Sequence, residues 1–275
     1  MPEIGLTDSS SLRLRRLKSL RKVLLPIVTI LLGFFLWQWL ASFLRIPSYI
    51  LPLPSQIFAS LLAKWPLIQN NALVTLWEIV LGFVAAVLIG GLVAIVIVYW
   101  PPFEVTFYPI LVAFQTVPKI ALAPLFVVWF GFGLFPKVLV TFLVAFFPVV
   151  VDTAVGLKSI DPQLLQVVRS MGATRSQIFF KIRLPNALPS IFAGCKVAIT
   201  FAVVGAIVGE FVGSDSGLGY LLLLAMLNLD TVLVFAALGV LTLMGIILYL
   251  IVEVIEKKSV FWHISSRSGE IGKTL

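Results

Sequence analysis

The chain has 275 residues, of which 60% are hydrophobic and only 12% are charged, and its formal net charge is +8. Soluble domains carry about a quarter charged residues, so this composition excludes a soluble globular protein and indicates an all-α polytopic membrane protein. A run of about 20 apolar residues can cross the hydrocarbon core of a bilayer. The sequence predicts six such transmembrane helices, at residues 23–44, 71–99, 104–128, 134–157, 190–212 and 230–253.

These spans divide the chain into four parts. Residues 1–22 form a basic tail, and residues 23–68 hold the first span and a short interfacial helix near residues 55–65. Residues 69–255 form the main transmembrane domain, with a polar loop at 158–189, and residues 256–275 form a second tail. The apolar run at 23–44 is longer than the 7–15 residues typical of a signal peptide, so we expect it to be retained as a span.

The basic residues predict the orientation. Fifteen of the 20 Lys and Arg residues lie in the two tails and the loop at 158–189, whereas the loops on the other side hold only Arg45, Lys64 and Lys137. The positive-inside rule therefore places both termini and the 158–189 loop in the cytoplasm, in a plasma (inner) membrane protein. The positive charge is then a topology signal and gives no reason to expect nucleic-acid binding.

The sequence offers no catalytic site. Cys195 and His263 are single residues of their kind, so neither a disulfide nor a metal cluster is expected. A G-x-x-x-x-G-K-[ST] phosphate loop is missing from the sequence, so the chain cannot hydrolyse a nucleotide by itself. We expect no catalytic residue, no metal and no cofactor.

Polar residues inside the third span are candidates for a transport pathway or gate. Gln115, Thr116 and Lys119 lie together near Pro118. A charge in hydrocarbon is costly unless it faces water or a partner, and a proline frees backbone carbonyls that can line a cavity. Lys119 either lines a pathway or extends to the interface.

The same question applies to three ionisable residues elsewhere in the spans, which are Asp152, Lys196 and Glu210. For Glu78, near one end of the predicted second span, we expect a hydrated position at the interface. The glycines of that span predict close helix packing. After the fifth span, a Gly-rich turn and about ten apolar residues predict a helix too short to cross the membrane.

The loop at 158–189 has readable local signals. Asp161 before Pro162 predicts the start of a helix that continues to Met171, and Gly172 predicts its end. Thr174 and Gln177 then form a predicted capping box that opens a second helix. Pro185 and Pro189 are expected to mark the entry to the next span.

Gly172 is followed by nine residues and then by Ile182-Arg183-Leu184-Pro185. This spacing resembles the cytoplasmic coupling motif of permease subunits of bacterial ATP-binding-cassette (ABC) importers. Gln166-Val167-Val168 stands where that family usually has Glu-Ala-Ala. The missing glutamate affects one polar contact to the ATPase but not the docking helix itself.

The resemblance extends over roughly residues 70–255. The runs Gln115–Gly131 and Gly209–Leu222, with Thr75-Leu76-Trp77 before Gly82, are similar to the nitrate, sulfonate, taurine and bicarbonate branch of these permeases. Related members import thiamine precursors or riboflavin. The implied fold is that of a type I ABC importer permease, with six transmembrane helices and a cytoplasmic coupling helix.

The resemblance also implies partners and site residues. It implies a homodimer in the lipid bilayer, two ATPase subunits on the cytoplasmic side and an extracytoplasmic solute-binding protein. The residues implied in ATPase coupling are Asp161, Gln166, Arg169, Gly172, Ala173, Ile182, Leu184 and Pro185. The candidate pathway or gate residues are Gln115, Thr116, Lys119 and Glu210.

Two questions stay open from the sequence. An ion-gradient-driven secondary transporter or channel is the alternative function, with Lys119 or Glu210 as its ionisable group. The solute is either a small anion, attracted by Lys119 with Gln115 and Thr116, or a flat heterocycle such as a pyrimidine, thiamine precursor or riboflavin. Phe114 and Phe126 could stack on such a ring.

Overall fold

The computed structural model describes residues 8–260, including all side chains in this range except those of residues 8–23, 101 and 108. The predicted tail residues 1–7 and 261–275, with His263, lie outside the described residues. The described elements are all helical, as predicted. In chain order they are α1 (Asp8–Phe43), α2 (Pro54–Ala63), α3 (Trp65–Tyr99), α4 (Pro101–Thr116), η1 (Lys119–Leu122), α5 (Ala123–Phe130), α6 (Leu134–Lys158), α7 (Pro162–Ser170), α8 (Arg175–Ile178), η2 (Phe179–Arg183), α9 (Leu184–Gly213), α10 (Leu218–Leu227) and α11 (Thr231–Ser259).

Five helices in the described range are long and apolar enough to cross a membrane, and a sixth span results if one bent pair is counted as a single span. That pair is the predicted third span, which is not one straight helix. Its two parts, Pro102–Thr116 and Lys119–Phe130, meet at 85°. Pro118 stands at the break, where its ring and missing N–H prevent α4 from continuing.

The predicted fifth span is longer than expected. Residues 175–213 form one apolar helical run of 39 residues, made of α8, the π-helical segment η2 and α9. Pro185 marks the start of α9, as expected, whereas Pro189 lies inside that helix. Pro185 lies in the first turn of α9, directly after the wider π turn, and a first-turn proline interrupts little helical hydrogen bonding. The second helix of the loop therefore leads through η2 into a membrane span without a break in helical structure.

The centre of the bundle is α6, which packs mainly against α9 and α3. Glycines make this packing close. A Cβ atom at Gly205 of α9 would lie 2.8 Å from Thr141 Cα of α6, and one at Gly82 of α3 would lie 2.5 Å from Thr141 Cγ2. Thr141 is thus held between two helices, as the glycine pattern of α3 predicted for that helix.

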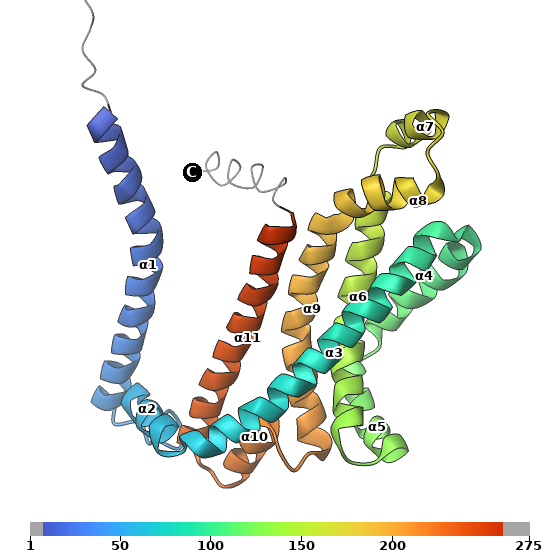
Figure 1. Ribbon diagram of the computed structural model, residues 1–275. Helices are drawn as coiled ribbons and strands as arrows, with labels where there is room; N and C mark the ends of the chain where they lie inside the picture. Colours follow the sequence, from blue (N-terminus) through green and yellow to red (C-terminus); the bar gives the residue numbers. More distant parts are fainter. Residues whose placement is uncertain (1–7, 261–275) are drawn as a thin grey trace, which may run out of the picture.

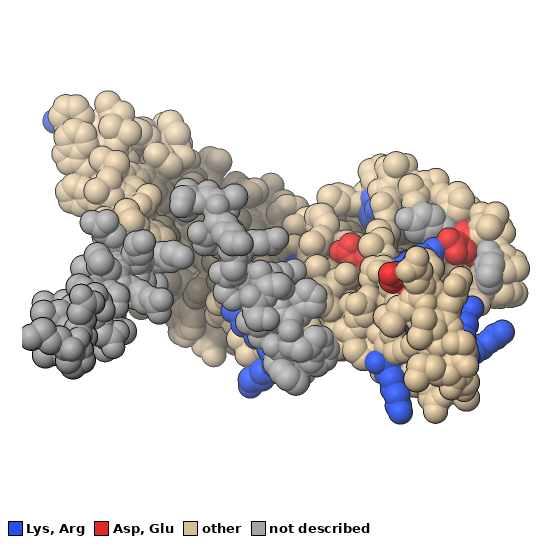
Figure 2. All heavy atoms as spheres, turned by 90° about the horizontal axis from the view of Figure 1, so that it is seen from above, with Lys and Arg blue, Asp and Glu red and all other residues tan. Residues whose placement is uncertain are grey.

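The elements fall at two ends of the bundle (Figure 1). The described start of α1, the end of α11 and the helices α7 and α8 lie at one end, which we call the coupling end, whereas α2, α5 and α10 lie at the other. Seen from the coupling end, Lys and Arg side chains project from a surface that is mostly neither basic nor acidic (Figure 2). α1 stands apart from the bundle and joins it through α2 and α11.

An ion pair holds the start of α11 at the end of the bundle opposite the coupling end. Lys64 Nζ lies 2.6 Å from Asp230 Oδ2, and the Asp230 carboxylate caps α11 by accepting the Leu233 N–H at 3.0 Å. Burial acts to raise the pKa of Asp230, but the Lys64 ammonium and the Leu233 amide outweigh burial and lower this pKa below its usual value. Both partners are about one-third exposed or more, so the pair is a modest stabiliser.

The close approach of α9 to α6 yields a testable expectation. Gly205→Ala places a methyl group against the α6 backbone, and such overpacking costs about 1–3 kcal/mol. The variant should therefore show a lower apparent Tm in detergent than the unaltered protein. Gly91→Ala in α3 is the matched control, because nothing lies within 4 Å of its added Cβ. Equal melting of the two variants would contradict the close α6–α9 contact.

Candidate functional site

The loop between α6 and α9 has the local structure that its sequence predicts. Asp161 caps α7, and its Oδ1 accepts the Gln163 N–H at 2.8 Å. Gly172 follows α7 with φ of +80°, a conformation that favours glycine. Thr174 and Gln177 form the capping box of α8, with reciprocal bonds of 2.8 and 3.3 Å. The predicted helix, glycine turn and second helix are confirmed.

α7 is exposed at the coupling end of the molecule. None of its residues is buried, and the apolar Leu164 and Val167 are about half exposed. Met171, directly after α7, is 80% exposed. Gln166 and Arg169 are also exposed. The helix therefore presents apolar and polar side chains that contact little of this chain, as a surface for docking another protein would.

The base of the loop is packed tightly. A Cβ at Gly156, near the end of α6, would lie 2.7 Å from Ser190 Cβ of α9. Asn186 Nδ2 donates to Ser159 Oγ at 2.9 Å. Both contacts join the two helices that flank the loop. Force applied to α7 would therefore reach α6 and α9 together.

The remaining predicted coupling residues lie at this base. Ala173 is half-buried in the turn after Gly172, and Ile182, Leu184 and Pro185 are half-buried around the junction of η2 and α9. Arg183 of η2 also lies over the Tyr99 ring of α3, with 5.2 Å between its Cζ and the ring centroid. The second half of the predicted motif thus joins the loop to the bundle.

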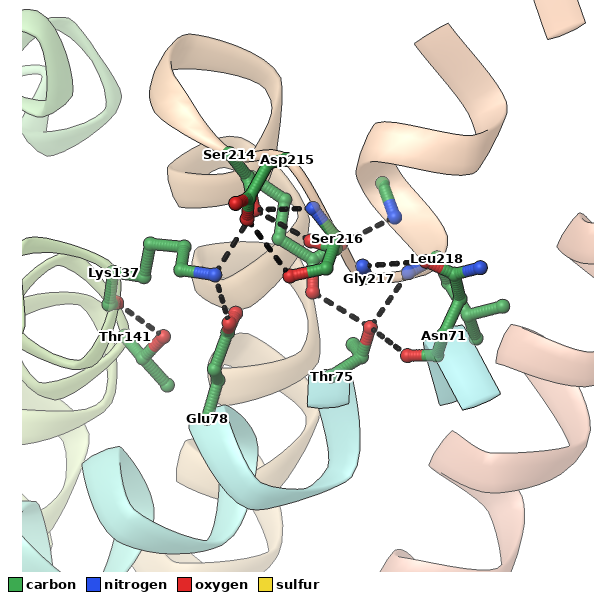
Figure 3. A network of polar contacts seen from close by, with 12 residues as sticks. Asn71, Thr75, Glu78, Lys137, Thr141, Ser214, Asp215, Ser216, Gly217 and Leu218 are labelled. Carbon is green, nitrogen blue, oxygen red and sulfur yellow. Dashed lines mark hydrogen bonds and ion pairs between the residues drawn. The ribbon is translucent and has the colours of Figure 1, made fainter. Parts of the chain in front are cut away.

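A buried polar network lies at the opposite end of α6 and α9 (Figure 3). Lys137 of α6 forms an ion pair of 2.5 Å with Glu78 of α3, and their side chains are 5% and 0% exposed. Lys137 Nζ also donates to Ser214 Oγ at 2.9 Å, in the turn after α9. One lysine therefore links α3, α6 and the α9–α10 turn.

This ion pair corrects two expectations. Glu78 was predicted at a hydrated interface and Lys137 in an outer loop, but both are buried. The second span was predicted to begin at residue 71, whereas α3 begins at Trp65, so Glu78 lies well inside the helix. Burial of each charge is possible because the other charge faces it.

Glu210 belongs to the same network. Thr75 Oγ1 donates to Glu210 Oε1 at 2.6 Å, and the Gly219 N–H donates to the same carboxylate. The Leu218 N–H donates to Thr75 Oγ1 at 2.8 Å. The start of α10 is thereby fastened to α3 and α9. Glu210 was predicted as a candidate pathway or gate residue, and its carboxylate lies in this enclosed network.

The Gly-rich turn is shaped around the Glu210 carboxylate. A Cβ at Gly217 would lie 2.2 Å from Glu210 Cδ, and the φ of Gly217 is +110°. Asn71 Oδ1 of α3 accepts the Gly217 N–H at 2.7 Å. The sequence reasoning did not identify Asn71 or Ser214, although the short spacing between Glu210 and the glycines was a signal that backbone amides approach the carboxylate.

Two of the predicted pathway residues of the third span line an open hollow beside α6 and α9. This hollow has a volume of about 370 Å³, and Gln115 and Lys119 are among its lining residues, with Asp152 and Phe147 of α6 and Phe201 of α9. Thr116 is exposed next to it and donates to Ala113 O at 2.7 Å. The structure thus brings Lys119 and Asp152 to one place and leaves Glu210 elsewhere.

The buried ion pair makes a prediction about stability. Lys137→Met leaves the Glu78 carboxylate buried without its partner, and removing one member of a buried pair costs about 3–5 kcal/mol. The variant should have a much lower apparent Tm in detergent than the unaltered protein. Lys64→Met is the control, because it breaks a part-exposed pair worth about 1 kcal/mol or less. Equal apparent Tm values for the Lys137→Met and Lys64→Met variants would contradict a stabilising role of the buried ion pair.

The sequence is similar to a family of membrane transport proteins. Residues 79–260 match the family model described as "Binding-protein-dependent transport system inner membrane component". The formylaminopyrimidine transport permease protein ThiX of Halalkalibacterium halodurans is 36% identical over 239 residues, covering 86% of this chain and 95% of ThiX. The riboflavin transport system permease protein RibX of Chloroflexus aurantiacus is 34% identical and covers 86% of this chain and 90% of RibX.

A third permease and a solved transporter structure are also similar to this chain. The taurine transport system permease protein TauC of Escherichia coli is 30% identical, covering 88% of this chain and 91% of TauC. A chain of the inward-facing MetNI methionine ABC transporter has the same fold, with a TM-score of 0.64, 22% identity, and coverage of 72% of this chain and 98% of that chain. The chain belongs to the family of inner membrane components of binding-protein-dependent transport systems, as an ABC importer permease.

Proposed function

We propose that this permease forms the translocation pathway for a small solute and that α7 is its docking point for a separate ATPase subunit. The observation that supports this most directly is the loop between α6 and α9. It presents an exposed helix, fixed at its capped start and at Gly172, on a base packed against two membrane helices. None of the residues of α7 is buried against the described part of the chain, which leaves its surface open to a partner.

The coupling can be followed through the backbone. The ATPase would bind and hydrolyse ATP, since this chain carries no phosphate loop. Movement of the docked α7 would be transmitted through Gly172 to α8, which continues through η2 into α9 as one helical run. Because α9 packs along α6, the two helices would move as a unit and change access to the pathway.

Family membership and the two ends of the molecule support the proposal of the other partners. A solute-binding protein would deliver solute at the end formed by α2, α5 and α10, away from the coupling loop. We propose a second copy of this chain as the other half of the pathway and an inner-membrane location with both termini in the cytoplasm. Family membership gives no support to the ion-gradient alternative.

The solute is proposed from the relatives' names and the hollow. Those relatives are named for formylaminopyrimidine, riboflavin and taurine, all small polar solutes. The hollow beside Lys119 is about 370 Å³, at the lower end of the 300–1,000 Å³ usual for small-molecule sites. A small solute that contacts Gln115 and Lys119 fits both the relatives' names and the volume of the hollow.

The proposed orientation can be tested with reporter fusions. Alkaline phosphatase joined after Lys64, between α2 and α3, should be active because that turn is expected outside the cytoplasm. The same enzyme joined after Ser159, before α7, should be inactive while a fluorescent protein there is bright. The reverse pattern would contradict the orientation deduced from the basic residues.

The coupling role predicts an effect of the turn at Gly172. Gly172→Leu forces a bulky side chain to adopt φ near +80°, which costs about 1–2 kcal/mol and shifts α7 relative to α8. The variant should insert normally yet lose ATPase co-purification and solute-stimulated ATP hydrolysis. Nothing lies within 4 Å of a Cβ at this position, so a change in turn geometry, not a steric clash, would cause the loss.

Gly172→Asn is the matched control, because Asn adopts positive φ more readily than other non-glycine residues. It should retain most of the stimulated hydrolysis. Wild-type ATPase binding and hydrolysis in the Leu variant would show that α7 is not the coupling helix.

A further inference from the structure

The hollow beside Lys119 carries two opposite charges. Gln115 and Lys119 reach it from the bent third span, and Asp152 reaches it from α6. Lys119 lies 4.5 Å from the centroid of the Phe147 ring, and Phe147 is near the middle of the 25-residue α6. Lys119 is therefore level with the middle of this apolar helix, which favours a pathway position over extension to the interface.

Neither charge has an oppositely charged partner within residues 8–260. Lys119 Nζ donates to the Gln115 backbone carbonyl at 3.0 Å, and among the described residues it forms no ion pair with a carboxylate. Asp152 likewise forms no ion pair or hydrogen bond within the described range. An unpaired charge at this depth is costly, so the arrangement calls for water or a polar ligand between the two groups.

The absence of a side chain at Gly194 of α9 leaves space for the Asp152 carboxylate. A Cβ at Gly194 of α9 would lie 2.7 Å from Asp152 Cβ and 3.0 Å from its Oδ2. Any side chain larger than hydrogen at Gly194 would therefore displace the carboxylate. The close contact between α6 and α9 thus also positions a charged group at Gly194.

We infer that this hollow binds a dipolar, amine-bearing solute, with an anionic or acceptor group toward Lys119 and an amino group toward Asp152. The inference deepens the proposed function by naming the solute class. A simple anion such as nitrate or bicarbonate is disfavoured, because the Asp152 carboxylate would repel it at the same site. The Phe147 and Phe201 rings provide apolar walls for the rest of the solute.

The first experiment tests the charges without requiring the natural solute. Phe201→Cys places a thiol in the hollow of the full-length permease, in a Cys195→Ala background, and its modification by a cationic and an anionic methanethiosulfonate reagent is timed in membrane vesicles. Asp152→Asn should slow the cationic reagent about fivefold, and Lys119→Met should slow the anionic reagent to a similar extent. Unchanged rates in both variants would overturn the inference.

Thr242→Cys is the control thiol. Thr242 lines a separate hollow between α9 and α11, so neither charge substitution should alter its modification. If its rates changed equally, the effect would reflect a general change in structure or access, and the charges would not act locally at the hollow. That outcome would also contradict the inference.

The second experiment addresses the solute. The importer, assembled with its own ATPase and binding protein, is tested for uptake of taurine, formylaminopyrimidine and nitrate. Uptake of either amine-bearing probe, reduced about tenfold by Asp152→Asn and by Lys119→Met with ATPase binding retained, supports the inference. Uptake of nitrate that is insensitive to Asp152→Asn overturns it.

Taurine and formylaminopyrimidine distinguish a zwitterionic solute from a neutral heterocycle. Failure of the proposed function itself would look different from failure of this inference. In that case the unaltered permease would not bind the ATPase, whatever the cysteine reagents report.

Discussion

The structure depends on a buried ion pair between Lys137 and Glu78. Each charge would be costly in the membrane alone, and together they join α6 to α3. Ser214 extends this link to the turn after α9, and Glu210 fastens the start of α10 through a backbone amide. The network therefore fixes the end of the bundle opposite the coupling loop, and the helices leave it in a defined relative position.

From this fixed end, α6 and α9 run together to the coupling loop. Gly205 and Gly156 allow the two helices to approach closely at two levels. The loop at their far end exposes α7 on a base that both helices share. The hollow with Lys119 and Asp152 lies between the two ends of this helix pair, against α6 and α9.

The predictable part of the candidate site was the part governed by local signals. Asp161, Thr174 and Gln177 act through backbone groups within three residues of themselves, so their roles follow from spacing alone. Gly172 could be predicted for the same reason. The partnership of Glu78 with Lys137, and the joint position of Lys119 and Asp152, could not, because each pair comes from different helices whose rotation no local pattern specifies.

The sequence by itself determined the membrane class, the approximate position of the apolar helices, and the helix, turn and helix of the coupling loop. Hydrophobic length and capping are properties of short segments, which explains this success. Only the tertiary structure decided that Glu78 is buried, that the third span bends by 85° and that α8 continues into α9. These features depend on which helix faces reach one another, and that is settled by packing across the whole bundle.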